Sequence, residues 1–455
     1  MTRLPDTKDT IAAQSTPQGS GALAVVRLSG PDAFKVASAF LGQAAARPRH
    51  AEARLMPVTD GQRLLDRAVV VFFKGPASYT GDDTVEISCH GSPHIIRTLL
   101  NLCVRNGARP AGPGEFTLRA FLNGKLDLAR AEAVAALIES SSAGAHRAAL
   151  AQAEGALSRE LETARRELVG LLAELEVRLD DSYEEIEPLA LARFARRAAA
   201  ARARLQALAD GYEAGRGVRE GLRVVITGAP NSGKSSLLNA LLGYDRALVS
   251  RSAGTTRDTL EGELEVDGFK VIFTDTAGLN ARPASQLERR GMRRAAAEIA
   301  RAGAVVLVAD GSIKETPSDR RAETEASALP AGARLIKVLN KCDLPARRPA
   351  AGRLRVSART GAGLAALKTA LVAEEKKAFS EGAQAVVTSA RHFAALSGAA
   401  EELRGMEALL KDREPRLELA AERLRAALAR IGEVTGETAP EEVLAGIFGT
   451  FCVGK

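Results

Sequence analysis

Tryptophan is absent from this chain of 455 residues, and cysteine is scarce. The four cysteines are too widely separated for a disulfide framework; they are Cys89, Cys103, Cys342 and Cys452. No unbroken apolar run approaches the roughly 18 to 20 residues that span a bilayer. Residues 1–20 also lack the apolar stretch of a signal peptide. We therefore expect a soluble, cytoplasmic protein with no membrane association.

Positive charge is in excess, with a formal net charge of +7. This excess suits a polyanionic partner, because neutralising phosphates releases their counterions. Arg/Ala runs such as residues 193–205 hold much of the excess, and such runs are equally typical of solvated helix faces. Charge alone leaves both interpretations open.

The pattern of apolar residues changes along the chain, and this length favours two or three domains. Residues 22–30, 67–73 and 84–91 are short apolar runs between Gly and Pro, typical of strands. Leucines three, four or seven apart then indicate a helix with one buried stripe; they are Leu157, Leu161, Leu168, Leu172, Leu175 and Leu179. Strand and helix patterns alternate over residues 219–379, and helical periodicity returns after residue 385. An α/β domain inserted into a helical domain is the predicted organisation.

A phosphate-binding motif follows the apolar run at residues 222–227. Residues 228–235 read G-x-x-x-x-G-K-S and lead into a helical pattern. Glycines let backbone N–H groups surround phosphates, the lysine reaches the β and γ oxygens, and the serine hydroxyl suits Mg²⁺. The predicted GTP contacts here are Asn231, Ser232, Gly233, Lys234, Ser235 and Ser236, with Ser235 on Mg²⁺ and Lys234 also catalytic.

Further motifs, in the order used by P-loop GTPases, specify guanine. Asp275, Thr276, Ala277 and Gly278 are expected near Mg²⁺ and the γ-phosphate. Asn340, Lys341, Cys342 and Asp343 are expected to read the base, with Asp343 accepting from the guanine N1 and N2 protons. Ser357, Ala358 and Arg359 supply a second base contact. The first switch is predicted at Ser250, Arg251, Ser252, Ala253, Gly254, Thr255 and Thr256, with Thr256 on Mg²⁺ and the γ-phosphate.

The water-positioning residue differs from that of Ras-like enzymes. Leu279 stands where Ras has the glutamine that orients the attacking water. Glu288, in the predicted second switch, is our candidate for that catalytic role. A solvated helix glutamate is the alternative interpretation.

Four segments outside the GTPase motifs resemble the MnmE (TrmE) family of tRNA-uridine modification GTPases. They are residues 9–33, 75–91, 112–138 and 434–455. The resemblance implies an N-terminal α+β domain at 1–122 that dimerises and binds tetrahydrofolate. It also implies a discontinuous helical domain at 123–218 and 380–455. A Ras-like P-loop GTPase domain, with a parallel-rich sheet and helices on both faces, would occupy 219–379.

The resemblance also implies a pocket for a tetrahydrofolate derivative, 5-formyl- or 5,10-methylene-tetrahydrofolate. Arg27, Glu86, Lys125 and Lys455 would bind it, with cations meeting the folate glutamate tail and Glu86 accepting from the pterin NH groups. By spacing alone, Arg27 and Glu86 are better interpreted as a strand salt bridge. Cys452 would bring a thiol towards the folate or the substrate, in a chemical role left open.

The GTPase motifs also fit the potassium-dependent members of this family. Asn231 would ligate K⁺ together with oxygens of Ser250, Ser252 and Thr255. A cation there would stabilise the transition state as an arginine finger does. Two departures stand out: residues 178–188 match the acidic segment of the family loosely, and Asn280 replaces a frequent arginine.

Two functions follow from these patterns. The first is a homodimeric GTPase that joins an FAD-dependent MnmG (GidA) type partner in a heterotetramer. That complex would add a carboxymethylaminomethyl-type group to the tRNA wobble uridine. The alternative is a regulatory or ribosome-assembly GTPase that binds RNA as a switch without one-carbon chemistry. Arg27, Glu86, Lys125 and Cys452 discriminate, because a switch has no use for a folate pocket.

Overall fold

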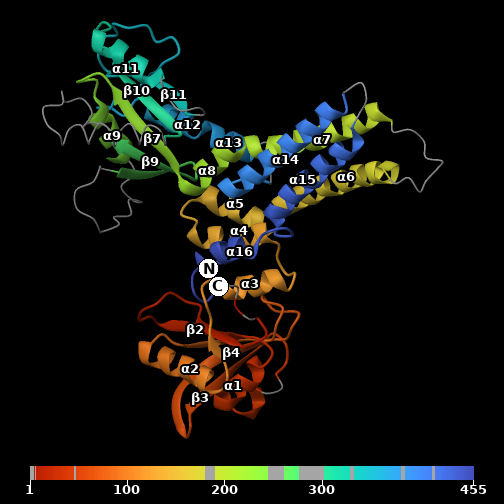
Figure 1. The fold of residues 1–455 in the computed structure, drawn as a ribbon. Helices are drawn as coiled ribbons and strands as arrows, with labels where there is room; N and C mark the ends of the chain where they lie inside the picture. Colours follow the sequence, from red (N-terminus) through yellow and green to blue (C-terminus); the bar gives the residue numbers. More distant parts are fainter. Residues whose placement is uncertain are drawn as a thin grey trace, which may run out of the picture. The chain divides into compact units, whose positions relative to one another are not determined.

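The computed structural model describes residues 5, 7–45, 48–179, 190–243, 261–275, 302–327, 333–380, 385–411 and 416–455. Internal contacts divide the chain into two compact units, residues 1–135 with 429–455 and residues 136–428. Among the described residues, each unit contains one six-stranded sheet (Figure 1). The predicted four-segment domain division places its boundaries at other residues than these two units do, and it stays a prediction.

The sheet of the first unit is mostly antiparallel. Its strands are β1 (Ile11–Gln14), β2 (Leu23–Ser29), β3 (Glu52–Asp60), β4 (Arg63–Phe73), β5 (Thr84–His90) and β6 (Arg109–Pro110). Their order across the sheet is β3-β4-β5-β2-β1-β6, and only β6 pairs in parallel, with β1. The three predicted strands correspond to β2, β4 and β5. β2 and β5 therefore lie side by side although their sequences are far apart.

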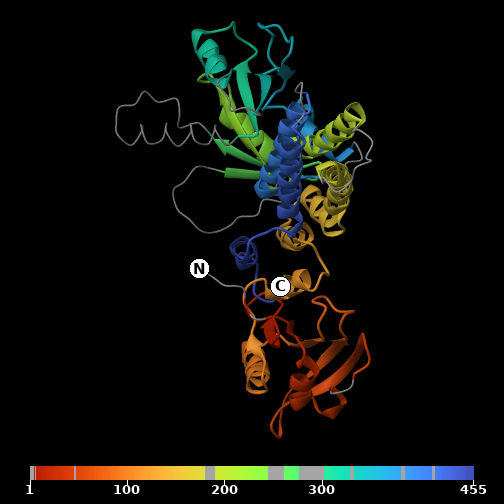
Figure 2. The ribbon, with the colours of Figure 1, turned by 45° about the vertical axis from the view of Figure 1, so that its right-hand side comes forward.

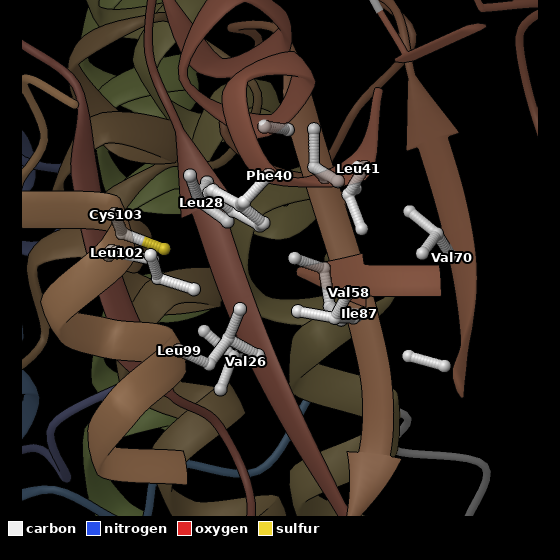
Figure 3. Close-up of a cluster of buried hydrophobic side chains, with 14 of the residues drawn as sticks. Val26, Leu28, Phe40, Leu41, Val58, Val70, Ile87, Leu99, Leu102 and Cys103 are labelled. Carbon is white, nitrogen blue, oxygen red and sulfur yellow. The ribbon is translucent and has the colours of Figure 1, made fainter. Parts of the chain in front are cut away.

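Helices α1 (Ala33–Leu41) and α2 (Pro93–Arg105) cover one face of this sheet. Alternate residues of the strands, such as Val26, Val70 and Ile87, meet Phe40 and Leu99 of the helices in one fully buried cluster (Figure 3). The opposite face of β2 and β5 carries the polar residues Arg27, Ser29, Thr84, Glu86 and Ser88 together with Leu23 and Val25. The unit also contains the 3-10 turn Gln43–Ala45, α3 (Glu115–Leu122), α4 (Leu128–Glu139) and α16 (Glu441–Gly449).

A buried ion cluster connects the first strand to α3. Arg119 is fully buried, and its guanidinium donates to Asp9 Oδ1 at 2.5 Å and to Glu115 Oε1 at 3.0 Å. Arg109 also contacts both carboxylates, at 2.7 Å each. Burial raises the pKa of Glu115, but hydrogen bonds from Arg109, the Gly112 N–H and Arg119 outweigh it and leave that pKa below its ordinary value. The cluster is therefore a charged part of the fold that requires Glu115 ionised.

Replacing Glu115 by glutamine should destabilise this unit by roughly 3 to 5 kcal/mol at pH 7, because two guanidinium groups lose a buried carboxylate. A carboxyl with a lowered pKa stabilises the fold above its ordinary pKa of 4.5 and loses that contribution as the pH falls through its folded pKa. The difference in the free energy of unfolding between wild type and Glu115→Gln should therefore narrow below about pH 4.5. Urea unfolding at several pH values measures this, with Glu52→Gln, on the same sheet, as the control. If this difference in unfolding free energy stayed the same at low pH, Glu115 would not stabilise the fold through its charge.

The sheet of the second unit is parallel apart from one edge strand. Its strands are β7 (Leu222–Gly228), β8 (Glu261–Val266), β9 (Phe269–Asp275), β10 (Ala304–Asp310), β11 (Arg334–Asn340) and β12 (Leu354–Arg355). The order is β12-β11-β10-β7-β9-β8, and only β8 is antiparallel to its neighbour. The carboxyl ends of β7, β9, β10 and β11 therefore meet at one edge, where ligands bind in such sheets.

Helices pack on both faces of this sheet, as predicted. α9 (Lys234–Gly243) and α12 (Leu364–Leu371) share a core with alternate residues of β7 and β10, including Val224 and Val306. α11 (Pro317–Ser327) buries Ala322 and Ala326 against Leu307 on the other face. α8 (Tyr212–Glu220) leads directly into β7, and α13 (Ala373–Ser380) follows α12. The predicted parallel-rich sheet with helices on both faces is confirmed.

All but the first of the remaining helices are long and lie side by side (Figures 1 and 2), and the last of them continues beyond residue 428. They are α5 (Ala143–Ala153), α6 (Ala156–Leu179), α7 (Leu191–Asp210), α14 (Ala390–Leu409) and α15 (Leu417–Thr435). The predicted leucine stripe of α6 is buried at four of its six positions, whereas Leu172 and Leu179 are only half-buried and Leu171, which was not predicted, is fully buried. Residue 171 falls closer to the stripe because its neighbours on it, Leu168 and Leu175, are three and four residues away. None of the helices in the described ranges combines the length and apolar character needed to cross a bilayer.

Candidate functional site

The loop between β7 and α9 has the backbone geometry of a phosphate cradle. Gly228 has φ +147°, Asn231 φ +64° and Gly233 φ +92°, values that glycine adopts freely and asparagine tolerates. A Cβ on Gly233 would lie 2.3 Å from Asn340 Nδ2, so only glycine fits there. Lys234 begins α9, and the free N–H groups of the helix start lie at the loop. The glycines are thus required by the turn itself.

Four side chains at this loop and the start of α9 suit a bound phosphate. The Lys234 amino group is buried and donates to the carbonyls of Gly228 and Ala229, at 3.0 Å each, so its charge is held over the loop. Ser232 Oγ is buried and has no hydrogen-bond partner in the described structure. Ser235 and Ser236 are exposed, so their hydroxyls are open to a metal ion or a phosphate. An orphaned buried hydroxyl beside a held ammonium fits a nucleotide phosphate.

Asn340 ties the turn at residues 340–343 to the loop between β7 and α9. It closes β11 and is 1% exposed. Its Nδ2 donates to the Ser232 carbonyl at 3.0 Å, and its Oδ1 accepts from the Ala358 N–H at 3.1 Å. The Lys341 amino group likewise donates to the Asn231 carbonyl at 3.0 Å and to Asp310 Oδ2 at 2.6 Å. Three segments distant in sequence therefore form one site.

The Asp343 carboxylate is held ready to accept hydrogen bonds. Ser357 Oγ donates to its Oδ1 at 2.7 Å, and Arg359 Nε lies 3.1 Å from its Oδ2. The Ser357 hydrogen bond is the largest cause of a pKa for Asp343 below its ordinary value. The Cys342 N–H donates to the Val356 carbonyl at 3.0 Å, which joins this turn to the one that carries Ser357. The carboxylate is thus ionised and oriented at neutral pH.

The first unit has a second cluster on the polar face of its sheet. Arg27 of β2 lies directly opposite Glu86 of β5, and its Nε donates to Glu86 Oε1 at 2.8 Å. The Arg27 guanidinium also lies over the rings of Tyr79 and Phe116, 5.8 and 5.6 Å from their centroids. Burial raises the pKa of Tyr79, so its hydroxyl stays protonated. An oriented ion pair with two aromatic rings suits a flat, anionic ligand.

The last residues of the chain complete this cluster. The Gly114 N–H donates to the Cys452 carbonyl at 3.3 Å, and the Phe116 N–H donates to the Lys455 carbonyl at 3.1 Å. The Gly454 carbonyl accepts from Arg27 Nη1 at 3.4 Å. Gly454 has φ +97°, and a Cβ there would lie 2.3 Å from the Gln14 carbonyl oxygen. The tail is therefore packed against β1, β2 and α3 by contacts that require glycine.

Lys455 adds a second cation beside Arg27. Burial, and then the charge of Arg27, lower the pKa of the Lys455 amino group. An anionic ligand between the two cations would relieve that repulsion. Cys452 is exposed in the same tail. Lys125 is placed differently, because its amino group donates to the Pro76 carbonyl at 2.8 Å and no contact joins it to the Arg27 cluster in the described structure.

Known families match nearly the whole chain. Residues 10–125 match the family described as GTP-binding protein TrmE N-terminus, and residues 128–452 match the MnmE helical domain. The tRNA modification GTPase MnmE of Xanthomonas campestris pv. campestris is 40% identical over 461 residues, which cover 100% of both chains. That of Thermus thermophilus is 43% identical over 98% of this chain and 99% of the relative.

The chain belongs to the MnmE family. Among solved structures, that of Aquifex aeolicus Era is 27% identical with a TM-score of 0.28 and covers 33% of this chain and 56% of its own. The FeoB G domain of T. maritima is 22% identical with a TM-score of 0.25, covering 34% of this chain and 98% of its own. At these TM-scores the two likenesses add nothing to the MnmE assignment.

Several predicted residues of this MnmE family chain lie outside the described residues. They are Ser250, Arg251, Ser252, Ala253, Gly254, Thr255, Thr256, Thr276, Ala277, Gly278, Leu279, Asn280 and Glu288. Asp275 closes β9 opposite Ile226 of β7, two residues before Gly228. The K⁺ ligands other than Asn231, the Thr256 contact to Mg²⁺ and the role of Glu288 therefore stay predictions.

Sequence reasoning missed some contributors to both sites. Asp310 is one, because it follows an apolar strand and holds Lys341 but belongs to no motif. Tyr79 and Phe116 are two more, although both lie inside segments that carried the MnmE resemblance. Their aromatic side chains, within polar and Gly-rich segments, were the feature that could have marked them as part of a binding site.

Proposed function

We propose that this MnmE family chain hydrolyses GTP in the modification of tRNA at the wobble uridine. The observation that carries the GTPase part is the bridging of the phosphate loop and the base-reading segments by Asn340. Relatives that match over their whole length are named tRNA modification GTPases, which supports the tRNA part. In this proposal residues 219–379 form the GTPase domain, residues 1–122 the folate-binding domain, and residues 123–218 with 380–455 the helical domain.

Phosphate binding and charge stabilisation are assigned to the loop between β7 and α9. Lys234 exchanges its two carbonyl partners for phosphate oxygens, and the Ser232 hydroxyl gains the partner it lacks. Ser235 and Thr256 hold Mg²⁺, which neutralises the charge developing on the β and γ oxygens when bound. Asn231, whose side chain is exposed at this loop, ligates K⁺ with Ser250, Ser252 and Thr255.

Nucleotide preference tests the GTPase assignment directly. The purified chain should turn over GTP with Mg²⁺ and K⁺, and should leave ATP nearly untouched, because Asp343 repels the adenine N1 lone pair where guanine presents an N–H. Phosphate release from each nucleotide at equal concentration measures this. Comparable turnover of ATP would contradict the base-pocket assignment.

Folate binding is assigned to the cluster around Arg27 and the chain terminus. Glu86 accepts from pterin NH groups, the Tyr79 and Phe116 rings flank the ligand, and Arg27 with Lys455 meets its carboxylates. The support is the single-unit cluster of two cations, one carboxylate and two rings. Lys125 enters only if it exchanges its Pro76 carbonyl partner for the ligand. Cys452 is exposed beside this cluster, in a role that its thiol chemistry leaves open.

Arg27→Ala should weaken the binding of 5-formyltetrahydrofolate by roughly 10- to 100-fold, since it removes a charge-assisted hydrogen bond and leaves Glu86 unpaired. Isothermal titration calorimetry measures the affinity. Arg54→Ala is the matched control, because Arg54 also pairs with a glutamate on this sheet, at Glu52.

Arg27→Lys should not rescue binding, because an ammonium does not reproduce the guanidinium fork over the rings. The folate assignment would be wrong if wild type gave no heat of binding with 5-formyltetrahydrofolate. It would also be wrong if Arg27→Ala bound this folate as tightly as Arg54→Ala does. That result would favour an RNA-binding switch GTPase without one-carbon chemistry.

Self-association and partners complete the proposal. Leu55 of β3 and Val69 of β4 are cross-strand neighbours on the edge of the first sheet, and both are exposed, at 68% and 44%. An exposed apolar pair at a sheet edge supports a homodimer formed through this unit. Light scattering should then give about twice the 47.8 kDa of one chain. An FAD-dependent MnmG (GidA) type partner, in a cytoplasmic heterotetramer, would supply the redox chemistry.

A further inference from the structure

A basic groove lies beside β11, on residues that the nucleotide site does not use. It has a volume of about 670 Å³ and is formed by Leu335 and Lys337 of β11, the segment at Lys314 and the loop through residues 347–353. Figure 1 shows α11 next to β11 on this flank. Its charged lining residues are Lys314, Glu315, Lys337, Arg347, Arg348 and Arg353. Five cations thus face the groove with a single carboxylate.

The chain after β11 contributes cations to this flank but no acid. No Asp or Glu occurs between Leu344 and Ala373, and the same stretch contains five arginines and a lysine. They are Arg347, Arg348, Arg353, Arg355, Arg359 and Lys368. The compensation comes from α11, where Glu323 pairs with Lys337 at 2.5 Å and lies 3.8 Å from Arg353. This flank therefore keeps a net positive charge.

The base of the groove is held by hydrogen bonds, whereas two cations at its edge are unpaired. Arg348 is 8% exposed and donates to the carbonyls of Ile313 and Lys314 at 2.9 and 3.1 Å and to Asp319 at 2.5 Å. These contacts fix the two walls of the groove to each other. The side chains of Lys314 and Arg347 are exposed and make no hydrogen bond or ion pair within the described part of the chain. Two free cations thus stand on a preorganised frame.

An RNA backbone fits this groove better than an acidic protein segment does. Protein interfaces bind through apolar and aromatic anchors and are depleted in lysine, whereas Leu335, Pro349 and Ala351 are the largest apolar groups lining the groove. Phosphate contacts come from unpaired Lys and Arg side chains. We propose that the groove of Lys314, Lys337, Arg347, Arg348 and Arg353 binds the phosphodiester backbone of the tRNA substrate. This inference rests on the proposed function in tRNA modification.

The test compares the binding of an unmodified tRNA transcript by the full-length chain and by the double variant Lys314→Ala/Arg347→Ala. Both side chains are exposed and unpaired, so the variant should fold and hydrolyse GTP as wild type does. Each lost phosphate contact removes about 0.7 to 0.9 from the slope of log affinity against log salt. The double variant should bind on the order of tenfold more weakly at 0.1 M salt, with a slope smaller by about 1.4 to 1.8.

A matched control removes two exposed arginines from α7, as Arg193→Ala/Arg196→Ala. Near-wild-type binding by this control, with weak binding by the groove variant, supports the proposal. Equal losses of tRNA affinity in the two variants would show that only the overall charge matters, and would overturn the proposal. A groove variant that binds tRNA as tightly as wild type would also overturn the proposal. So would a groove variant that loses affinity for a polyglutamate peptide but keeps its affinity for tRNA. Wild type that fails to bind tRNA at all would instead count against the proposed function.

Discussion

Asp343→Asn should lower the affinity for GTP by roughly 10³-fold, because a site built to accept two N–H groups rejects a ligand whose donors it cannot satisfy. The carboxylate is oriented by Ser357 and Arg359, and the hydrogen bond from Ser357 keeps its pKa low, so it presents ionised oxygens to the base. The asparagine amide donates where the carboxylate accepted. It should therefore pair with the C2 carbonyl of xanthine, and the variant should gain affinity for xanthosine triphosphate.

Fluorescent-nucleotide titration of both triphosphates measures this exchange of specificity. Asp210→Asn is the matched control, because Asp210 is exposed in the same unit and belongs to no nucleotide motif. Unchanged GTP affinity in Asp343→Asn would show that the turn from Asn340 to Asp343 does not read the base. Loss of both nucleotides would indicate a damaged site rather than altered specificity, and would equally contradict the assignment.

Glu288→Ala should bind GTP normally and hydrolyse it roughly 10²- to 10³-fold more slowly, as removal of a group that acts only in the transition state does. The apolar side chain of Leu279 cannot orient water, so we assign that role to Glu288. Charge stabilisation is assigned to K⁺ on Asn231. Replacing K⁺ by Na⁺ at equal ionic strength should then slow wild type by a similar factor without weakening binding.

Single-turnover hydrolysis and nucleotide affinity, measured on the same samples, separate the two effects. Glu265→Ala is the control, since Glu265 is an exposed glutamate on β8 in the same unit. A fully active Glu288→Ala would make that residue a solvated helix glutamate. Equal turnover in the two salts would leave Asn231 as a spacer in the loop.

The second sheet and its nucleotide loop were predictable because their determinants are local. Each central strand of a parallel sheet is a continuous apolar run, and the loop after β7 needs glycine at Gly228 and Gly233 for its backbone angles. β3 was not identified, since its exposed positions alternate with buried ones such as Met56 and Val58 and leave no apolar run. An amphipathic edge strand gives a weaker signal than a buried one.

The contacts of the cluster around Arg27 depend on residues that are far apart in the sequence. Arg27 and Glu86 are 59 residues apart, and their contact depends on the register between β2 and β5. The contact of Arg27 with Gly454 joins positions 427 residues apart. The spacing of residues favoured the strand salt bridge between Arg27 and Glu86 that the structure shows. Only the family resemblance assigned this pair to a folate site, and nothing in the sequence indicated the contact with Gly454. The side chain of Asn340 joins Ser232 to Ala358, a contact that the motif alone did not predict, and its contact to GTP stays a prediction.

Mass spectrometry of tRNA from a strain that lacks this gene tests directly whether this protein acts in tRNA modification. We expect loss of the carboxymethylaminomethyl-type group from C5 of the wobble uridine. The wild-type gene should restore it, and Lys234→Ala at equal protein level should not, because the buried ammonium of the phosphate loop is gone. Wobble uridines that stay modified without the gene, or are restored equally by Lys234→Ala, would contradict a GTP-dependent role in tRNA modification.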